Sequence, residues 1–134
     1  MQTFQANPKM TTMQGVFYPT GYAVVLFPDA DNADEAGRRL QAAGFADSDM
    51  QLLTPPVILR DIGGIDGESE DILPLVGTEG TTVQHYVKLA RDGHHGLLVK
   101  TDSDDVSEQM MVVVREMPMS YGQRYRMLAI EDLE

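Results

Sequence analysis

The 134-residue sequence contains no cysteine. Disulfide bonds, thiolate-ligated zinc and cysteine nucleophiles are therefore excluded together. No apolar run approaches the roughly 18 residues of a membrane-spanning helix, and the first residues have no apolar core of signal-peptide length. We expect a cytoplasmic protein that does not enter a membrane.

Basic residues are scarce: 10 Lys and Arg stand against 21 Asp and Glu, a formal net charge of −11. Such a field repels phosphate backbones and anionic membranes, so neither nucleic acid nor membrane is expected as a partner. Solubility is the simplest reason for the acidic balance. Hydrophobic residues make up 43% of the chain and charged residues 23%, as in ordinary globular proteins.

The chain divides into an arm and a folded part. Residues 1–20 show no hydrophobic period and predict a poorly ordered N-terminal arm, whereas residues 21–134 predict a single domain. Segment 61–71, DIGGIDGESED, has three glycines and five acids, which predict a solvated connection between two halves of that domain. A helix is expected around residues 58–75.

The first half has the order strand, helix, strand. Segment 21–28, GYAVVLFP, is apolar on both faces and predicts the first strand. Asn32 is the expected N-cap of the helix, and Gly44 predicts its end. MQLLT at 50–54 predicts the second strand, closed by a double proline that a central strand does not tolerate.

The second half repeats this order. A capping box at Thr81 and Gln84 predicts the start of a helix that ends at Gly93. The elements expected after it are a strand at 94–102, a helix capped by Ser103 or Asp105 and ended by Pro118, and a closing strand at 124–133.

Two β-α-β units predict an α+β fold of the ferredoxin-like plait type. Right-handed crossovers place both helices on one face of a four-stranded antiparallel sheet, with the extra helical and acidic connection between the halves. A doubly wound parallel sheet is the alternative, but it does not suit a long polar break in the middle of the chain.

The segment GYAVVLFPDADNADEAGRRLQAAGF resembles the opening of small bacterial general-stress-type domains. The segment HYVKLARDGHHGLLVKTDSDDVSEQMMVVVREM is similar to a helix-Gly-strand-helix unit in related uncharacterised bacterial proteins of the α/β-plait type. The resemblance covers roughly residues 21–133 and implies the fold. It carries over no catalytic residue, and an acidic loop here replaces the glycine-rich hydrophobic middle of the stress-type domains.

The stretch RDGHHGLLVKTDSDD, residues 91–105, raises the question of a metal site. Successive side chains on a strand point to opposite faces, so His94 and His95 are not expected to share one ion. No histidine pair has the His-x-x-x-His spacing of a zinc-binding helix. The aspartates are explained by the strand end and the first turn of the next helix, where the dipole favours acids. No metal and no cofactor are expected.

A catalytic site is not predicted either. The chain has no Gly-x-Ser-x-Gly, P-loop or Gly-x-Gly-x-x-Gly pattern. Ser103 near His95 and Tyr86 near His94 are conceivable pairs, but a serine before two acids is more typical of an N-cap. No catalytic residue is assigned. The candidates for ligand or interface contacts are His94, His95, Tyr86 and Tyr125.

The strands at 22–27 and 124–133 are apolar on both faces, although helices of a plait cover one face only. Either the helix near 58–75 or a second copy of the protein must cover the other face. We favour a homodimer that acts as a non-enzymatic binding or regulatory module, with a small molecule or protein as partner. The alternative is a small dimeric plait-type enzyme with His95 as acid or base in an interfacial cavity, and Tyr86 or Tyr125 positioning the substrate.

Overall fold

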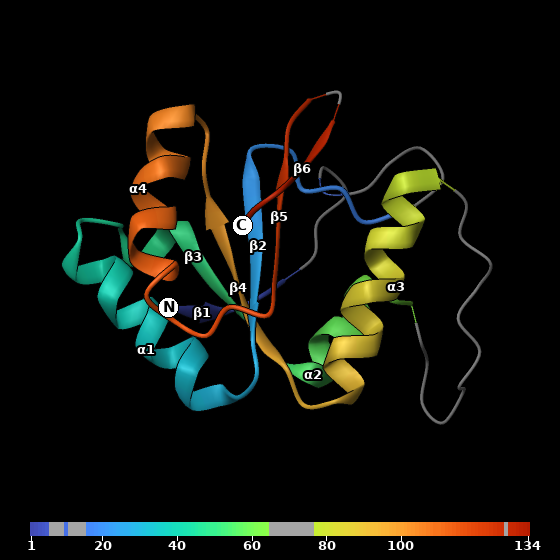
Figure 1. The fold of residues 1–134 in the computed structure, drawn as a ribbon. Coiled ribbons are helices and arrows are strands. Elements are labelled where there is room, and N and C mark those ends of the chain that lie inside the picture. The colour runs from blue at the N-terminus through green and yellow to red at the C-terminus, as the bar shows by residue number, and fades with distance from the viewer. Residues whose placement is uncertain (6–9, 11–15, 65–76, 128) are drawn as a thin grey trace.

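The structure, a computed structural model, describes residues 1–5, 10, 16–64, 77–127 and 129–134. These residues form an α+β fold with four helices and a six-stranded mixed sheet (Figure 1). The strands are β1 (Gln2–Thr3), β2 (Tyr22–Phe27), β3 (Met50–Leu53), β4 (His95–Lys100), β5 (Tyr121–Tyr125) and β6 (Ile130–Asp132). The helices are α1 (Ala30–Ala42), α2 (Pro55–Val57), α3 (Gly77–Arg91) and α4 (Asp104–Val114), with a 3-10 turn η2 (Asp47–Asp49) and a π-helical turn η3 (Ile58–Ile62).

The strand order in the sheet is β1-β3-β4-β2-β5-β6. The four central strands, β3, β4, β2 and β5, pair with one another in antiparallel fashion. β1 adds to one edge in parallel with β3, and β6 adds to the other edge antiparallel to β5. The sheet therefore has six strands and is mixed, not four-stranded and purely antiparallel as predicted. A doubly wound parallel sheet is excluded, because one pairing alone among the described strands is parallel.

The closing strand expected at 124–133 is in fact a hairpin. The chain reverses after β5, where the Arg126 N–H donates to the Ala129 carbonyl at 2.8 Å, and Tyr125 then pairs with Ile130. The prediction of one strand was wrong because this turn contains no glycine or proline and its sequence stays largely apolar.

Helix starts were predicted with mixed success. Ser103 caps α4 as expected, since its Oγ accepts a hydrogen bond from the Val106 N–H at 3.2 Å. α1 begins three residues earlier than expected, because Asp29 and not Asn32 is the N-cap, accepting from the Asn32 N–H at 2.8 Å. α3 begins at Gly77, ahead of the predicted capping box at Thr81.

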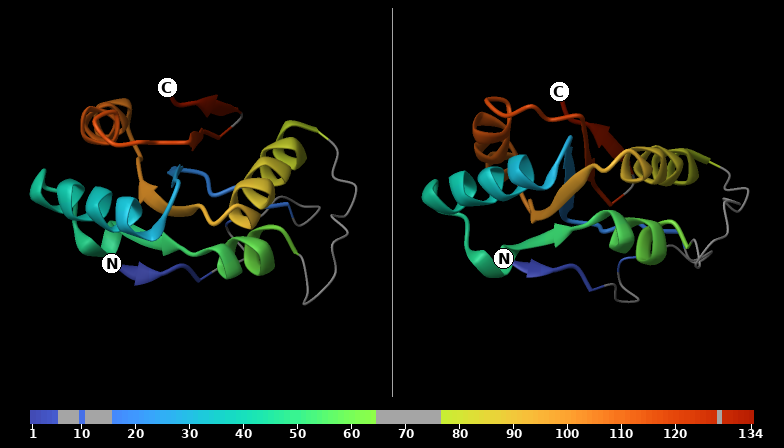
Figure 2. Two further views of the ribbon diagram at one scale, coloured as in Figure 1. Left: turned by 60° about the horizontal axis from the view of Figure 1, so that its bottom comes forward. Right: turned by 90° about the horizontal axis from the view of Figure 1, so that it is seen from below.

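Helices cover both faces of the sheet and not one face as predicted. α1 and α4 lie on one side, and α2 and α3 lie on the other (Figures 1 and 2). Alternate residues of β2 serve the two layers: Val25 packs in the cluster with α1 and α4, and Leu26 packs in the cluster with α3. Two apolar faces on each central strand thus give a three-layer protein with two cores.

The covering layer comes from the chain itself. Within α3, Val83, Tyr86 and Val87 are at most 1% exposed and pack in one cluster with η3 and the sheet. The expected helix at 58–75 is described only as far as η3 and the glycines after it, and 65–76 lie outside the described residues. The sequence predicted a homodimer because one apolar face of the sheet was expected to need a cover. In the structure α3 and η3 of the same chain cover that face.

Three large apolar side chains of the N-terminal segment are buried in the core. Phe4 and Phe17 are 2% and 3% exposed, and their ring centroids lie 6.0 Å apart in an edge-to-face arrangement. Met10 belongs to the same cluster. The segment predicted as a poorly ordered arm therefore adds core residues to the α3 side of the sheet.

Candidate binding site

Tyr86 and Tyr125 are brought together by the fold. Their hydroxyl oxygens lie 2.7 Å apart, and the side chains are 0% and 1% exposed. Burial raises the pKa of Tyr86 well above its ordinary value, and the neighbouring Tyr125 phenol raises it further. The pair joins α3 to β5 inside the core, so a ligand has no direct access to it.

His94 and His95 do not join that pair. His94 Nδ1 lies 3.0 Å from the Leu89 carbonyl oxygen, and His95 Nδ1 lies 3.0 Å from the Gly93 carbonyl oxygen. His95 pairs with Phe27 at one end of the β2–β4 ladder, whereas Tyr125 lies beyond the other end of β2, where its carbonyl accepts from the Gly21 N–H. The four candidates therefore belong to two separate places.

The two nucleophile–base pairs considered from the sequence are not formed. Ser103 lies beyond the C-terminal end of β4, the strand that His95 begins, and its hydroxyl caps α4. Tyr86 donates to or accepts from Tyr125 and not His94. The third histidine, His85, stacks on Tyr121 with ring centroids 5.2 Å apart on the outer side of α3. It lines a surface hollow of about 190 Å³ with Thr81, Gln84 and Lys88.

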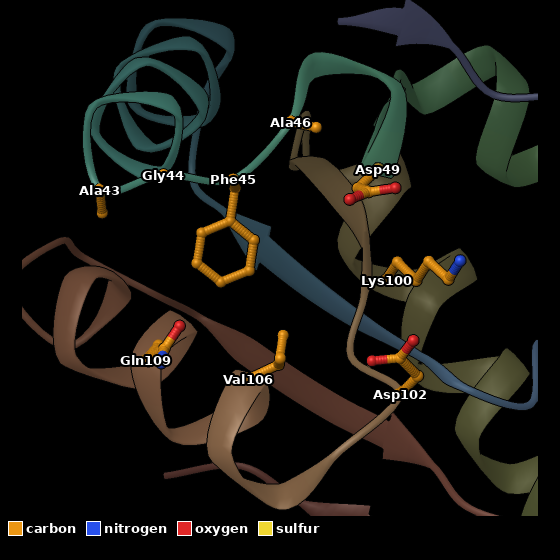
Figure 3. Close-up of a pocket in the computed structure, with 9 residues that line it drawn as sticks. All are labelled: Ala43, Gly44, Phe45, Ala46, Asp49, Lys100, Asp102, Val106 and Gln109. Carbon is orange, nitrogen blue, oxygen red and sulfur yellow. The ribbon is translucent and has the colours of Figure 1, made fainter.

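A hollow, here called the Phe45 pocket, lies between the end of α1, the end of β4 and the first turns of α4 (Figure 3). Its volume is about 250 Å³. Gly44, with φ of 107°, turns the chain out of α1 and places Phe45 under the opening. The pocket is lined by Ala43, Gly44, Phe45, Ala46, Asp49, Lys100, Asp102, Val106 and Gln109.

Two carboxylates dominate the chemistry of the Phe45 pocket. Asp49 is half-buried and Asp102 is exposed, and within the described chain neither carboxylate forms a hydrogen bond or an ion pair. Figure 3 shows both carboxylates near the opening, while the Lys100 side chain extends away from the Phe45 ring. The carbonyl end of α1 adds partial negative charge on the same side. The pocket therefore combines an aromatic ring, Phe45, with two carboxylates that outnumber its one lysine.

Sequence reasoning missed this pocket. It assigned the aspartates of residues 102–105 to a strand end and a helix turn, whereas β4 ends at Lys100, two residues before Asp102. The signal was present, because Asp102 belongs to the stretch RDGHHGLLVKTDSDD, but its pocket partner Asp49 comes from a turn 53 positions earlier in the sequence. The helix-strand geometry that joins them is a tertiary property.

The described residues contain no group of three His, Asp or Glu side chains placed to hold a metal ion, and no helix among them is long and apolar enough to cross a membrane. No family model, curated protein or solved structure matches the chain. Function has to be argued from the site itself.

Proposed function

We propose that the chain is a small non-enzymatic binding module on a ferredoxin-like plait of the general-stress type, and that it holds a cationic group in the Phe45 pocket. Support for the plait comes from the antiparallel order β3-β4-β2-β5, with α1 and α4 packed on the same face. The strand β1, the hairpin strand β6 and the layer formed by α2 and α3 are additions to that plan.

The single observation that carries the binding role is the pair of carboxylates, Asp49 and Asp102, that line the pocket with Phe45 and form no ion pair within the described chain. A cation placed there gains attraction from Asp49 and Asp102 and from the face of the aromatic ring, an interaction worth about 0.5–2 kcal/mol in general. The net charge of −11 also attracts a cationic ligand at long range. An alkylammonium or guanidinium group on a short apolar stem matches this arrangement.

A non-enzymatic role is supported by what lines the pocket. Catalysis by proton transfer or nucleophilic attack requires a positioned base beside a nucleophile or substrate. The lining has no hydroxyl or thiol side chain, so Asp49 and Asp102 have no such nucleophile beside them to activate, and neither His94 nor His95 lines this pocket. The alternative enzyme with His95 in a cavity gains no support from this geometry.

The homodimer expected from the sequence stays a prediction, and this proposal does not depend on it. The apolar face that suggested a second copy is covered by α3 and the N-terminal segment. A monomer with one exposed pocket is sufficient for binding.

The test is a titration of the isotope-labelled chain with butylammonium chloride, followed by amide NMR shifts. Saturating shifts are expected around Phe45, Val106 and Gln109. The double variant Asp49→Asn/Asp102→Asn should weaken binding about tenfold or more, whereas Asp34→Asn, an exposed acid on α1 outside the pocket, should leave it within about twofold.

A neutral probe of the same shape separates charge from apolar contact. We expect 1-butanol to bind more weakly than butylammonium. Equal binding of the two probes would contradict the cationic role of the pocket, and shifts confined to other regions would remove the Phe45 pocket as the site.

A further inference from the structure

A second hollow lies on the other side of Asp102, where the end of β4, the turn before β2 and the end of β5 meet. It has a volume of about 240 Å³, and its lining includes Gly21, Thr101, Arg124 and Arg126. We call it the Arg124 pocket. Asp102 is the one residue that it shares with the Phe45 pocket.

Arg124 is a buried charge with few partners. The residue is 7% exposed, yet a guanidinium carries five N–H donors. Within the described chain it makes one hydrogen bond, from Nη1 to Asp104 Oδ1 at 2.7 Å. Nε and Nη2 therefore have no acceptor among the described residues. Thr101 Oγ1 is the one fully buried side-chain polar atom without a partner in the described chain, so these two Arg124 nitrogens keep some contact with solvent at the hollow.

Thr101 presents a second unmet group to the same hollow. It is 1% exposed, and its Oγ1 has no hydrogen-bond partner among the described residues. Its backbone N–H is already used, donating to the Gly21 carbonyl at 2.8 Å. The hydroxyl is thus a fully buried donor without an acceptor among the described residues, in a residue that lines the hollow. Thr101, directly after β4, and Arg124 in β5 thus both line the hollow and both carry donors without an acceptor in the described chain.

Asp104 already binds some of the arginine N–H donors at this hollow. Its carboxylate lies 2.7 Å from Arg124 Nη1 and 3.5 Å from Arg126 Nη2, and these two cations lower the pKa of Asp104 below its ordinary value. The Asp104 side chain is 74% exposed, so it can turn into solvent at little cost. A carboxylate is therefore the group that the two arginines already bind in the structure.

We propose that Arg124, Arg126 and Thr101 form a binding site for the carboxylate of a small organic acid, and that Asp104 competes for this site from within the chain. Arginine matches a carboxylate with two parallel N–H donors, which a point charge does not. The Thr101 hydroxyl would supply a third donor to the same group. This inference goes beyond the proposed function and uses a different pocket.

The surrounding charges select a carboxylate over a phosphate. Asp102 lines the hollow, and Glu131 lies 3.4 Å from Arg126 Nη1. With Asp104 these three acids outnumber the two arginines, and the chain as a whole is strongly negative. A doubly charged phosphate would meet more repulsion than a singly charged carboxylate.

The test uses the full chain and sodium butyrate as the probe, with amide NMR shifts as the readout and sodium chloride at equal ionic strength as the reference. Butyrate should shift residues around Thr101 and Arg124, and chloride should not. Asp104→Asn should tighten butyrate binding about two- to fivefold, the range of an exposed ion pair. Asp105→Asn removes the same charge one residue along α4 and should change the affinity by less than about twofold.

Two arginine variants test the donors. Arg124→Lys keeps the charge but loses the planar fork, and butyrate affinity should fall about tenfold. Should that variant not fold, Arg126→Gln, at a half-exposed position, should still weaken binding severalfold. The proposal is overturned by the absence of butyrate shifts around Arg124 in both the natural chain and Asp104→Asn. Tighter binding of inorganic phosphate than of butyrate would overturn the carboxylate class.

The binding proposals for the two pockets can be tested separately. Asp49→Asn lies in the Phe45 pocket alone and should leave butyrate affinity unchanged, whereas Arg124→Lys should leave butylammonium binding unchanged. Loss of one probe's binding without the other therefore identifies which of the two proposals is wrong.

Discussion

The phenol oxygens of Tyr86 in α3 and Tyr125 in β5 lie 2.7 Å apart inside the core. The hydrogen bond ties the helical layer formed by α3 to the edge half of the sheet. Rings of Phe17 and Tyr121 pack edge-to-face around Tyr86, at centroid distances of 6.3 and 5.7 Å. The pair thus stabilises the junction of two layers instead of contacting a ligand.

Removal of either hydroxyl should destabilise the fold through the same bond. Tyr86→Phe and Tyr125→Phe are each expected to lower the free energy of unfolding by about 1 kcal/mol, and the double variant by less than the sum. Urea unfolding followed by circular dichroism measures all three. Tyr22→Phe is the control, because its phenol makes no hydrogen bond within the described chain, and strict additivity of the two core variants would contradict the coupling.

The Tyr86 pKa predicts a loss of stability at alkaline pH. Burial, and then the Tyr125 phenol, raise this pKa well above 10.0 in the folded state, so folding favours the protonated form. The contribution is complete below the unfolded pKa of about 10 and is lost as the pH rises from there towards the folded value. Urea midpoints should fall between about pH 9 and pH 11, and Tyr86→Phe should flatten that fall. An unchanged slope in the variant would assign the alkaline loss to other groups.

The N-terminal segment is predicted to be essential for stability. Phe17 is 3% exposed and contacts the rings of Phe4, Tyr86 and Tyr125. Phe17→Ala should cost about 3–5 kcal/mol, a large part of the stability of an ordinary domain. Val112→Ala, at a position 60% exposed, is the matched truncation of a surface residue and should cost little. A loss below about 1 kcal/mol for Phe17→Ala would mean that the segment behaves as a dispensable arm.

Local signals predicted most of the elements. Apolar runs marked β2, β3 and β4, and the residues Gly44 and Ser103 marked a helix end and a helix start. The hairpin between β5 and β6 was missed because its turn carries no glycine or proline. Burial of Phe4 and Phe17 was missed because isolated aromatic residues in a polar segment show no period, and Tyr86, which contacts Phe17, is 69 positions further along the chain.

The candidate sites were beyond the reach of sequence patterns for a related reason. The two adjacent histidines attracted attention, yet each bonds to a backbone carbonyl near its own position. In contrast, the pockets combine residues that have unremarkable local roles: Asp49 in a 3-10 turn, Thr101 at a strand end, and Arg124 within a strand. Only the sheet register places Arg124 of β5 opposite Ala23 of β2 and thus close to the start of α4.

Self-association provides the last prediction. Both sheet faces are covered, and the large apolar side chains that are exposed in the described chain are scattered: Met1, Val112 and Met127. The edge strand β6 is short and carries Glu131 and Asp132, so pairing with a second copy would bring acids together. Sedimentation equilibrium at pH 7.5 and pH 5.5 should therefore give the monomer mass of 14.8 kDa at both values.

A different outcome would restore the homodimer expected from the sequence. A dimer at pH 7.5 that dissociates at pH 5.5 would point to a histidine at its interface, since histidine is the side chain that ordinarily changes charge in that interval. His94→Gln and His95→Gln would then distinguish the two neighbours, because only the histidine in the interface would make the dimer pH-dependent. A dimer at both values would instead require an interface outside the two covered faces, and β6 would be the first edge to test with a charge-reversing Glu131→Lys variant.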